Sequence, residues 1–214
     1  MLFNDVVLNE RIVAIIRGVD AAKTVKAVQA LYDGGIRIAE ITFNQSRPET
    51  FEETAEVIRV VAETFDGKMI IGAGTVVSTR LVDMVAASKG KFIITPNINL
   101  GVIQRAHDRG LVPIPGAMTP SEIMTAYDAG SPFIKLFPAV DLGINYVKNV
   151  RAPLSHVPLL AVGGIDEKNV SDFLAAGCVG VGVGGALVNG KLTESGNFDQ
   201  ITRNARDFVQ LVKK

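Results

Sequence analysis

The sequence has few of the residues that build disulfides and metal centres. Its 214 residues include one cysteine, two histidines and no tryptophan. A single cysteine cannot form a disulfide within the chain, and His107 and His156 do not stand at a recognised metal-ligand spacing. We therefore expect no internal disulfide, no metal and no cofactor.

A surplus of charge and long apolar runs are absent as well. The 22 basic residues balance the 22 acidic ones and the pI is near 6.7, so the composition does not indicate the basic face that nucleic acid or a membrane surface would require. No apolar run approaches the roughly 18 residues of a transmembrane helix. Residues 1–11 lack the basic start and apolar stretch of a secretory signal. We expect a cytoplasmic protein without nucleic-acid or membrane partners.

What the sequence does contain is a regular series of short apolar segments rich in Ile and Val. They begin roughly every 24 residues, which leaves room for one crossover helix between consecutive segments. They are continuous rather than alternating, which is typical of buried parallel strands. The predicted strands are residues 12–16, 36–42, 69–71, 92–95, 112–114, 133–137, 159–162 and 179–183.

The segments between these strands show helical periodicity, and several end in a glycine just before the next strand. Glycine at that point is typical of a left-handed helix stop. The glycines concerned are Gly35, Gly90, Gly110, Gly130 and Gly177. Strict alternation of eight strands with about eight helices predicts an α/β fold, a single (β/α)8 TIM barrel over residues 1–214. Further helices are expected at about residues 2–8 and 198–212, and a doubly wound sheet is the alternative architecture.

In a barrel of this kind the functional side chains lie at the carboxyl ends of the strands. Polar residues and glycines gather at those positions in this sequence. The candidates are Arg17, Glu40, Asn44, Thr75, Pro96, Lys135, Gly163, Gly164, Gly184 and Gly185. The polar side chains would converge on one face, and the glycines would let a ligand approach the backbone.

Lys135 is the most unusual of these residues. It lies in the apolar segment 132–138, which offers an ammonium group no evident partner. Lysine is almost never fully buried unless it is paired, and an unpaired charge taken out of water tends to shift its pKa instead. A neutral amine held in such a place can attack a carbonyl. The alternative is a lysine whose stem is buried and whose head reaches water at the strand end.

Glu40 interrupts the second apolar segment in a similar way. Alternation along a strand places Glu40 on one face with Ile38, and Lys135 on one face with Phe133. If both faces point into the barrel, the two groups form either a structural ion pair or a catalytic pair. In a catalytic pair Lys135 would form a Schiff base and Glu40 would move protons. The separation of the two groups decides between these interpretations.

Arg17 and two glycine pairs suggest where an anionic substrate would bind. The guanidinium fork of Arg17 suits a carboxylate or a phosphate, although a surface arginine at a loop is the alternative. Gly163-Gly164 and Gly184-Gly185 follow the seventh and eighth predicted strands. Barrels commonly bind phosphate at those two loops, although ordinary turn glycines would give the same pattern.

Several of these motifs occur together in the order seen in one family, so the sequence resembles the KDPG/KHG aldolase family. Its members are 2-keto-3-deoxy-6-phosphogluconate and 4-hydroxy-2-oxoglutarate aldolases. The resemblance extends over about residues 13–188. It rests on Glu40-Ile41-Thr42, Gly72-Ala73-Gly74-Thr75, Thr95-Pro96, Pro115-Gly116, Lys135-Leu136-Phe137-Pro138 and Gly163-Gly164.

The resemblance implies a (β/α)8 class I aldolase, usually a homotrimer, that cleaves a 2-keto-3-deoxy sugar acid to pyruvate and an aldehyde such as glyceraldehyde 3-phosphate. Lys135 matches the Schiff-base lysine and Glu40 the acid/base of the family. The expected substrate contacts are Arg17, Thr75 and Pro96 at the pyruvate end, Gly163 and Gly164 at the phosphate, and also Asn44, Gly184 and Gly185. The expected partners are therefore small molecules, pyruvate and a keto-deoxy sugar acid.

Three departures from the family pattern concern the substrate. Asn44 stands where the phosphogluconate enzymes often have arginine, Gly185 where many members have a phosphate-contacting serine, and Val162 where several have threonine. The residues that look more like the 2-keto-3-deoxy-6-phosphogalactonate branch are Val162-Gly163-Gly164, Arg17-Gly18, Asn44 and Thr95-Pro96-Asn97. The missing serine at Gly185 weakens the expectation of a phosphate. The gluconate and galactonate series and the need for a phosphate therefore stay open.

Other functions remain as alternatives at this point. One is 4-hydroxy-2-oxoglutarate aldolase activity, which yields pyruvate and glyoxylate. A second is a phosphosugar-binding barrel, for example an isomerase or decarboxylase, that forms no imine. A third is a catalytically silent barrel that senses an acidic metabolite, and the presence of both Glu40 and Lys135 argues against it because a binder needs no suppressed amine.

Overall fold

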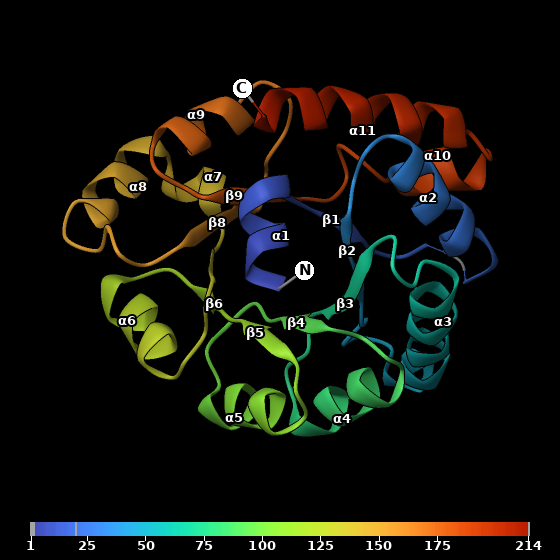
Figure 1. The fold of residues 1–214 in the computed structure, drawn as a ribbon, viewed down its shortest axis with the longest axis horizontal. Coiled ribbons are helices and arrows are strands. Elements are labelled where there is room, and N and C mark those ends of the chain that lie inside the picture. Colours follow the sequence, from blue (N-terminus) through green and yellow to red (C-terminus); the bar gives the residue numbers. More distant parts are fainter. Residues whose placement is uncertain (1–2, 20, 214) are drawn as a thin grey trace.

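The computed structural model describes residues 3–19 and 21–213 and shows a ring of parallel strands surrounded by helices (Figure 1). Hydrogen-bonded neighbours in the sheet follow the order β5-β4-β3-β2-β1-β9-β8-β7-β6. The strands are β1 (Ile12–Ile16), β2 (Ile38–Thr42), β3 (Ile70–Gly74), β4 (Phe92–Ile94), β5 (Val112–Ile114), β6 (Gly116–Ala117), β7 (Ile134–Leu136), β8 (Leu159–Val162) and β9 (Gly180–Val183). The predicted (β/α)8 barrel is confirmed.

The fifth unit of the barrel contributes two strand segments instead of the single predicted strand. β5 pairs with β4, β6 pairs with β7, and Pro115 lies between the two segments. A proline has no N–H to donate to a ladder, which interrupts regular pairing there. The carbonyl of Pro115 still accepts a hydrogen bond from the Lys135 N–H at 2.9 Å. Because the two ends of the sheet are adjacent in sequence, the ring closes at this proline.

Helices form the outer layer of the molecule (Figure 1). They are α2 (Ala21–Asp33), η1 (Pro48–Thr50), α3 (Phe51–Thr64), α4 (Thr79–Ala87), α5 (Leu100–Asp108), α6 (Pro120–Asp128), α7 (Ala139–Leu142), α8 (Ile144–Arg151), α9 (Val170–Ala175), α10 (Gly190–Glu194) and α11 (Phe198–Val212). α11 corresponds to the helix predicted at about residues 198–212. None of the helices described is long and apolar enough to cross a membrane.

The remaining helix, α1 (Phe3–Glu10), lies over the centre of the ring (Figure 1). It corresponds to the helix predicted at about residues 2–8, of which residue 2 lies outside the described residues. Val6 and Val7 pack with the inward-facing strand residues. The Phe3 ring lies 5.2 Å from Phe92 and 6.4 Å from Phe133, centroid to centroid. This helix therefore closes the end of the barrel opposite the carboxyl ends of the strands.

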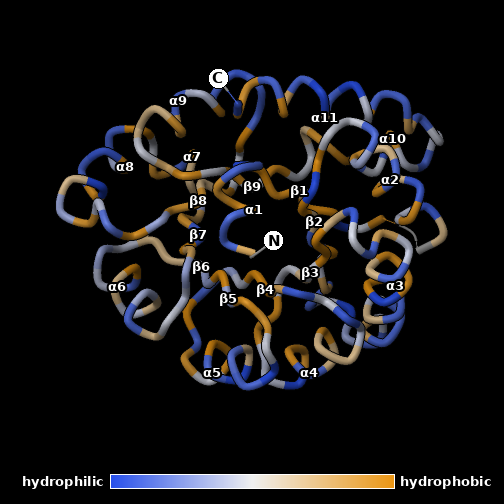
Figure 2. The backbone as a smooth tube through the Cα atoms, viewed as in Figure 1, coloured by the Kyte–Doolittle hydropathy of each residue, from blue (hydrophilic) through white to orange (hydrophobic). Residues whose placement is uncertain are grey.

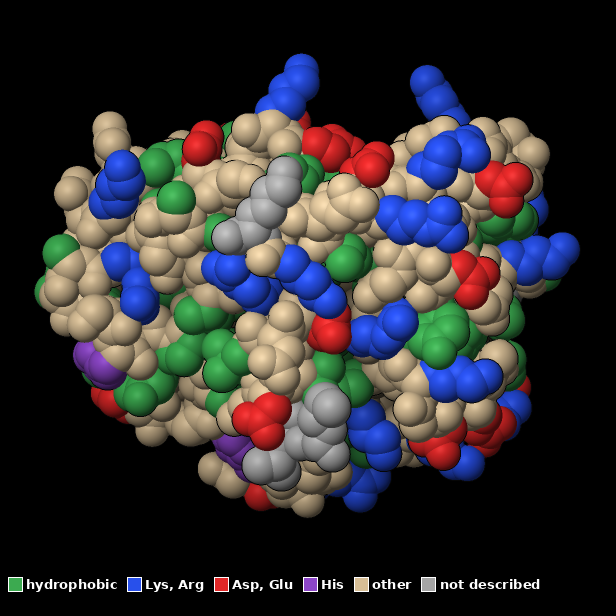
Figure 3. Space-filling view, turned by 45° about the horizontal axis from the view of Figure 1, so that its top comes forward, with side chains coloured by type: hydrophobic (Ala, Val, Ile, Leu, Met, Phe, Trp, Pro, Cys, Tyr) green, Lys and Arg blue, Asp and Glu red, His purple; other side chains and the backbone are tan. Residues whose placement is uncertain are grey.

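The strands are buried on both faces, and this produces two apolar layers. Along β1, Ile12, Ala14 and Ile16 face the helices, whereas Val13 and Ile15 face the barrel interior. Figure 2 shows hydrophobic residues concentrated in the strands. The continuous apolar segments of the sequence follow from this double burial. On the surface, basic and acidic side chains intermingle over the face shown in Figure 3.

Four of the five predicted glycine stops adopt the left-handed conformation, and one does not. Gly35, Gly110, Gly130 and Gly177 have positive φ, whereas at the end of α4 it is Lys89 that has φ +62°. The prediction for Gly90 was therefore wrong. A Cβ at Gly90 would lie 2.5 Å from the Val85 Cγ1, so close packing accounts for this glycine, and backbone conformation does not.

Candidate active site

Lys135 lies in the middle of β7, between β6 and β8, and its side chain is 6% exposed. Its neighbours in register are Gly116 and Leu160. The Nζ lies 4.6 Å from the centroid of the Phe137 ring, which is two residues along the chain. A cation over an aromatic face is weakly stabilised, but a ring does not replace the water that an ammonium group loses on burial.

Glu40 occupies the middle of β2, between β1 and β3, and is 2% exposed. The Thr42 hydroxyl donates to its Oε1 at 3.5 Å. The other carboxyl oxygen, Oε2, is buried and has no hydrogen-bond partner among the described residues. A buried polar atom without a partner is uncommon and suggests a functional constraint.

Gly74, at the end of β3, makes room for this carboxyl group. A Cβ at Gly74 would lie 2.4 Å from the Glu40 Oε1 and 2.9 Å from the Thr42 Oγ1. No real contact is that short, so a side chain here would force the carboxyl group to move. The sequence suggested that the strand-end glycines admit a ligand to the backbone, whereas this one admits the side chain of Glu40.

The electrostatics of the two groups differ from those of a simple ion pair. Burial raises the pKa of Glu40 to about 7, against the opposing effects of Lys135, Arg17 and the Thr42 hydrogen bond. Burial lowers the pKa of Lys135, an effect opposed by Glu40 and reinforced by Arg17. Among the described residues, no ion pair within 4.0 Å joins Lys135 to Glu40. The two groups therefore influence each other without a direct contact that would neutralise both.

A cavity of about 570 Å³ opens beside Lys135 at the carboxyl ends of β1, β7, β8 and β9. It brings together six of the predicted site residues from four separate units of the barrel. They are Arg17, Lys135, Gly163, Gly164, Gly184 and Gly185. Arg17 and Lys135 are the only cations in its lining as far as the described residues show, so the cavity suits an anionic carbonyl compound.

The glycine loops present backbone donors to this cavity. The N–H groups of Gly164, Ile165, Gly185 and Ala186 donate no hydrogen bond to any other residue within 3–19 and 21–213. Gly163 and Gly164 both have positive φ, at +100° and +77°. Successive unpaired N–H groups of this kind form anion-binding concavities in other proteins. The two loops can therefore hold an oxyanion without a cationic side chain.

Two asparagines that the sequence analysis did not single out support these loops. The side-chain amide of Asn169 donates to the carbonyl of Gly164 at 3.0 Å, and that of Asn189 donates to the carbonyl of Gly185 at 3.2 Å. A signal existed, because each glycine pair is followed within a few residues by an asparagine that precedes a helix. Asp166 also lines the cavity, and no sequence pattern indicated it.

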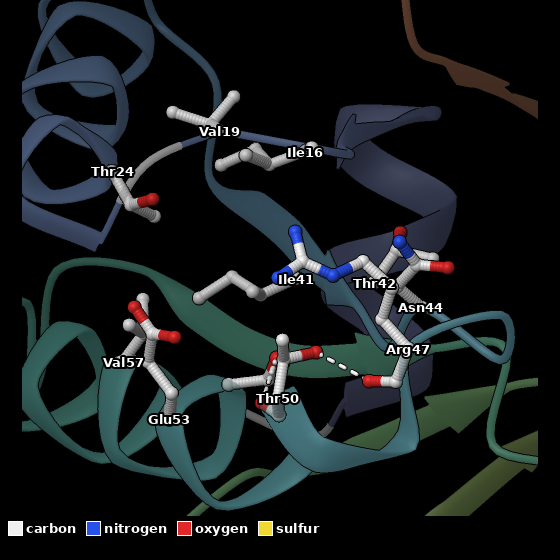
Figure 4. Close-up of a pocket in the computed structure, with 12 residues that line it drawn as sticks. Ile16, Val19, Thr24, Ile41, Thr42, Asn44, Arg47, Thr50, Glu53 and Val57 are labelled. Carbon is white, nitrogen blue, oxygen red and sulfur yellow. Dashed lines mark hydrogen bonds between the residues drawn. The ribbon is translucent and has the colours of Figure 1, made fainter.

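Asn44 lies in a different cavity, of about 360 Å³, between β1, β2 and α3 (Figure 4). Ile15 lines the first cavity and Ile16 the second. The two linings share no residue, although Thr42, whose hydroxyl donates to Glu40, lines the second cavity. Arg47 also extends into the second cavity (Figure 4). Asn44 and Lys135 thus line different cavities, and the role of Asn44 in substrate binding stays a prediction.

Thr75 and Pro96 follow the neighbouring strands β3 and β4 but do not line the cavity beside Lys135. Thr75 has φ +58°, which is unusual for a residue other than glycine. Pro96 packs against the fifth unit, where a Cβ at Gly116 would lie 2.5 Å from the Pro96 carbonyl. Their predicted place at the pyruvate end stays a prediction. Among the described residues, no three His, Cys, Asp or Glu side chains gather closely enough to hold a metal ion.

Comparisons with known proteins place these features in context. A family model described as KDPG and KHG aldolase matches residues 3–204. A 2-dehydro-3-deoxy-6-phosphogalactonate aldolase of Escherichia coli (strain K12) is 35% identical over 177 residues, covering 82% of this chain and 83% of that protein. The KHG/KDPG aldolase of the same strain is 32% identical, covering 88% of this chain and 86% of that protein.

A solved structure shows the same arrangement of the chain. It is described as native KDPGal, is 33% identical to this chain, and superposes with a TM-score of 0.84 over 94% of each chain. The match in sequence and the match in fold thus cover nearly the same share of the chain.

Proposed function

The chain belongs to the KDPG and KHG aldolase family and is a carbon–carbon lyase, and from that premise we propose that Lys135 is its Schiff-base nucleophile and Glu40 its acid/base catalyst. The proposed substrate is a 2-keto-3-deoxy sugar acid of the gluconate or galactonate series, phosphorylated at C6. The proposed products are pyruvate and an aldehyde such as glyceraldehyde 3-phosphate.

The observation that supports this role is the pair of buried, ionisable groups in the middle of β2 and β7. Lys135 is 6% exposed with a lowered pKa, and Glu40 is 2% exposed with a pKa raised to about 7. A larger fraction of the amine is therefore neutral, and able to attack a carbonyl, than would be neutral in water. The carboxyl group titrates close to neutral pH, where an acid/base catalyst is most effective.

The first half of the proposed reaction activates the substrate. The Lys135 Nζ attacks the C2 carbonyl carbon to form a carbinolamine, which loses water to give a protonated imine. The cation at nitrogen then draws electrons from the substrate. Glu40, ionised, removes the proton of the C4 hydroxyl, directly or through a water molecule. The C3–C4 bond breaks, its electron pair moves toward the iminium group, and the aldehyde leaves behind an enamine on Lys135.

The second half returns the enzyme to its starting state. Glu40, now protonated, delivers its proton to C3 of the enamine and regenerates an imine. Water adds to this imine, and its collapse releases pyruvate and the neutral amine of Lys135. Each proton that Glu40 accepts is given back within one turnover, so the chemistry needs no outside reagent other than water.

The loops at the mouth of the cavity support an anionic group at the far end of the substrate. The unpaired N–H groups of Gly164, Ile165, Gly185 and Ala186 belong to residues that line this region, and backbone donors of this kind hold phosphate in many enzymes. The relative with 35% identity is a phosphogalactonate aldolase by name. Turnover of the gluconate and galactonate epimers, each with and without phosphate, identifies the preferred substrate.

A second candidate reaction is the cleavage of 4-hydroxy-2-oxoglutarate to pyruvate and glyoxylate. The two carboxylates of this substrate carry less negative charge than the carboxylate and phosphate of a phosphorylated sugar acid, and the described lining offers only Arg17 and Lys135 as cations, beside the acidic Asp166. A relative named KHG/KDPG aldolase carries both activities in its name. Inclusion of this substrate in the same turnover assay separates the two reactions.

Trapping of the imine tests the proposed function directly. Incubation with pyruvate and borohydride should reduce the imine to a stable adduct, and peptide mass analysis should place it on Lys135. The variant Lys135→Met should form no adduct and should lose about 10³-fold or more of its activity, because the nucleophile is absent. Lys148→Met is a matched control, since Lys148 is an exposed lysine on α8. An adduct on another lysine would contradict the assignment.

We also propose that the protein forms a homotrimer. Large apolar side chains are exposed on three neighbouring units at the active-site end of the barrel, namely Leu100, Met118 and Val140. Apolar side chains exposed on adjacent units are the kind of surface that an interface would cover. Light scattering after gel filtration should give three times the 22.8 kDa mass of one chain, and a mass of one or two chains would exclude the trimer.

A further inference from the structure

The loop between β2 and α3 is tied to the end of β3 by one side chain. The Gln45 Nε2 donates a hydrogen bond to the carbonyl of Thr75 at 2.9 Å. Thr75 follows β3 directly and has φ +58°. A β-branched residue with a left-handed backbone is a genuine outlier, and such a conformation persists only where its surroundings hold it.

The residues on either side of Thr75 are held by backbone groups. The N–H of Phe43 donates to the carbonyl of Gly74 at 3.0 Å, and the N–H of Val76 donates to the carbonyl of Ile94 at 3.2 Å. The carbonyl of Thr75 lies between these two anchors and accepts its hydrogen bond from the side chain of Gln45. Of these three contacts, it is the one that a point substitution can remove.

Gln45 reaches Thr75 from a turn that Asn44 organises. The side-chain oxygen of Asn44 accepts hydrogen bonds from the Ser46 N–H at 3.1 Å and the Ser46 hydroxyl at 2.7 Å, and its carbonyl accepts from the Arg47 N–H at 3.0 Å. These contacts fix the backbone on both sides of Gln45. The turn is therefore already formed, and the Gln45 side chain needs little further ordering to donate its hydrogen bond to the Thr75 carbonyl.

We infer that Gln45 is a positioning residue that holds Thr75 in its left-handed conformation and so fixes its hydroxyl for the carboxylate end of a 2-keto acid bound on Lys135. This inference rests on the proposed function and on the place at the pyruvate end that the sequence predicts for Thr75. Without the hydrogen bond, the Thr75 backbone can relax to negative φ. Its carbonyl and its side chain then turn away from their present directions, and the hydroxyl no longer meets the carboxylate.

The measurement is the pyruvate concentration that gives half-maximal borohydride trapping on Lys135. In Gln45→Ala and in Gln45→Glu, which keeps the shape but has no N–H to donate, it should rise about tenfold, the change expected from one lost contact to a charged group. The maximal extent of trapping and the melting temperature should stay near those of the wild type, because Gln45 is exposed. Gln29→Ala is the matched control: this exposed glutamine donates to Asp33 at 2.8 Å on α2, and its loss should change nothing.

A double-mutant cycle with Thr75→Ala distinguishes positioning from a general effect on the loop. If Gln45 acts through the Thr75 hydroxyl, Gln45→Ala should raise the half-maximal pyruvate concentration no further once Thr75 is replaced by alanine. An equal rise in both backgrounds, or wild-type affinity in both Gln45 variants, would overturn the inference while leaving the imine on Lys135 intact. Absence of any adduct in the wild-type protein would instead overturn the proposed function, and this inference with it.

Discussion

Lys135 and Glu40 acquire their proposed roles from what surrounds them, since both side chains are common. Two strands far apart in the sequence carry them into the same apolar interior. There burial moves the two pKa values toward each other, that of Glu40 up and that of Lys135 down. Pairs of titratable groups shifted by burial in this way are characteristic of acid/base sites.

The first prediction concerns the stability cost of burying Glu40. Its pKa is 4.5 when unperturbed and about 7 in the folded protein, so the folded state keeps a proton that the unfolded state has lost between these pH values. Stability therefore falls as the pH rises through this window, by at most about 3 kcal/mol. Glu40→Gln should be more stable than the wild type at pH 8 by about 1–3 kcal/mol and equal to it near pH 4.5. Urea unfolding at the two pH values measures the difference, and a Glu40→Gln variant that is less stable than the wild type at pH 8 would contradict it.

The second prediction concerns the pH dependence of cleavage. Because the ionised form of Glu40 is the proposed base and its pKa is about 7, kcat/KM should rise with pH up to about 7. Glu40→Gln should lose this rise along with about 10²–10⁴-fold of the rate. A pH–rate profile of both proteins measures it, and a wild-type profile flat from about pH 5 to 8 would exclude Glu40 as the base.

The third prediction concerns Gly74. In Gly74→Ala the new Cβ would meet the Glu40 Oε1 at 2.4 Å, so the carboxyl group must move away from β3. We expect the rate to fall about 10–100-fold, since displacement of a catalytic group by about 1 Å can cost this much, while imine trapping on Lys135 persists. Single-turnover kinetics separate the two steps. A loss of trapping equal to the loss of turnover would show that the substitution disturbs more than Glu40.

At the scale of the elements, local signals set where several helices begin and end. α6 begins with a complete capping box, in which the Thr119 hydroxyl accepts from the Glu122 N–H while the Glu122 carboxylate accepts from the Thr119 N–H. Thr119-Pro120 shows this start in the sequence itself, because both residues favour a helix N-terminus. Local reasoning failed at Gly90, where the residue that turns left-handed is Lys89 and the glycine is required by Val85 across the turn.

The fourth prediction concerns this cap. Thr119→Ala removes the acceptor for the Glu122 N–H and should reduce the free energy of unfolding by about 0.5–2 kcal/mol. The cavity beside Lys135 does not include α6, so activity at low temperature should be unchanged. Thermal unfolding measures the effect, and Ser121→Ala in the same helical turn is the control. If both substitutions reduced the free energy of unfolding equally, the capping hydrogen bond of Thr119 would contribute no stability of its own.

At the scale of the whole molecule, the barrel closes twice, in the sheet at Pro115 and in the outer layer where α11 meets α2. The Thr202 hydroxyl donates to the carbonyl of Ala30 at 3.0 Å across this second contact. The two helices approach so closely at Gly34 that a Cβ there would lie 2.3 Å from the Ala205 Cβ. The packing of the first unit of the chain against the last thus depends on Gly34, which has no side chain.

The fifth prediction concerns this contact. Gly34→Ala should push α11 away from α2 and reduce the free energy of unfolding by about 1–3 kcal/mol, the usual cost of overpacking. Gly190→Ala is the matched control, because a Cβ there would meet only the Glu194 Oε1 at 3.7 Å. Urea unfolding of both variants measures the difference. An unchanged free energy of unfolding in Gly34→Ala would mean that α11 and α2 pack less tightly at this contact than the distances imply.

The sequence by itself determined the barrel and the residues at its strand ends. Double burial makes each parallel strand a continuous apolar segment, so the eight units could be counted directly, and an isolated Lys135 or Glu40 within such a segment stands out. Polar residues at strand ends were sufficient to indicate the location of a site, since all strands point the same way.

Only the tertiary structure decided how these residues meet. It keeps Glu40 out of direct contact with Lys135, leaves room at Gly74 for the carboxyl group of Glu40, and places Asn44 in the lining of a second cavity. It also joins Gln45 to Thr75, which lies 30 residues further along the chain. Contacts and separations of this kind depend on how separate strands twist and pack against one another. The local pattern of a sequence does not determine them.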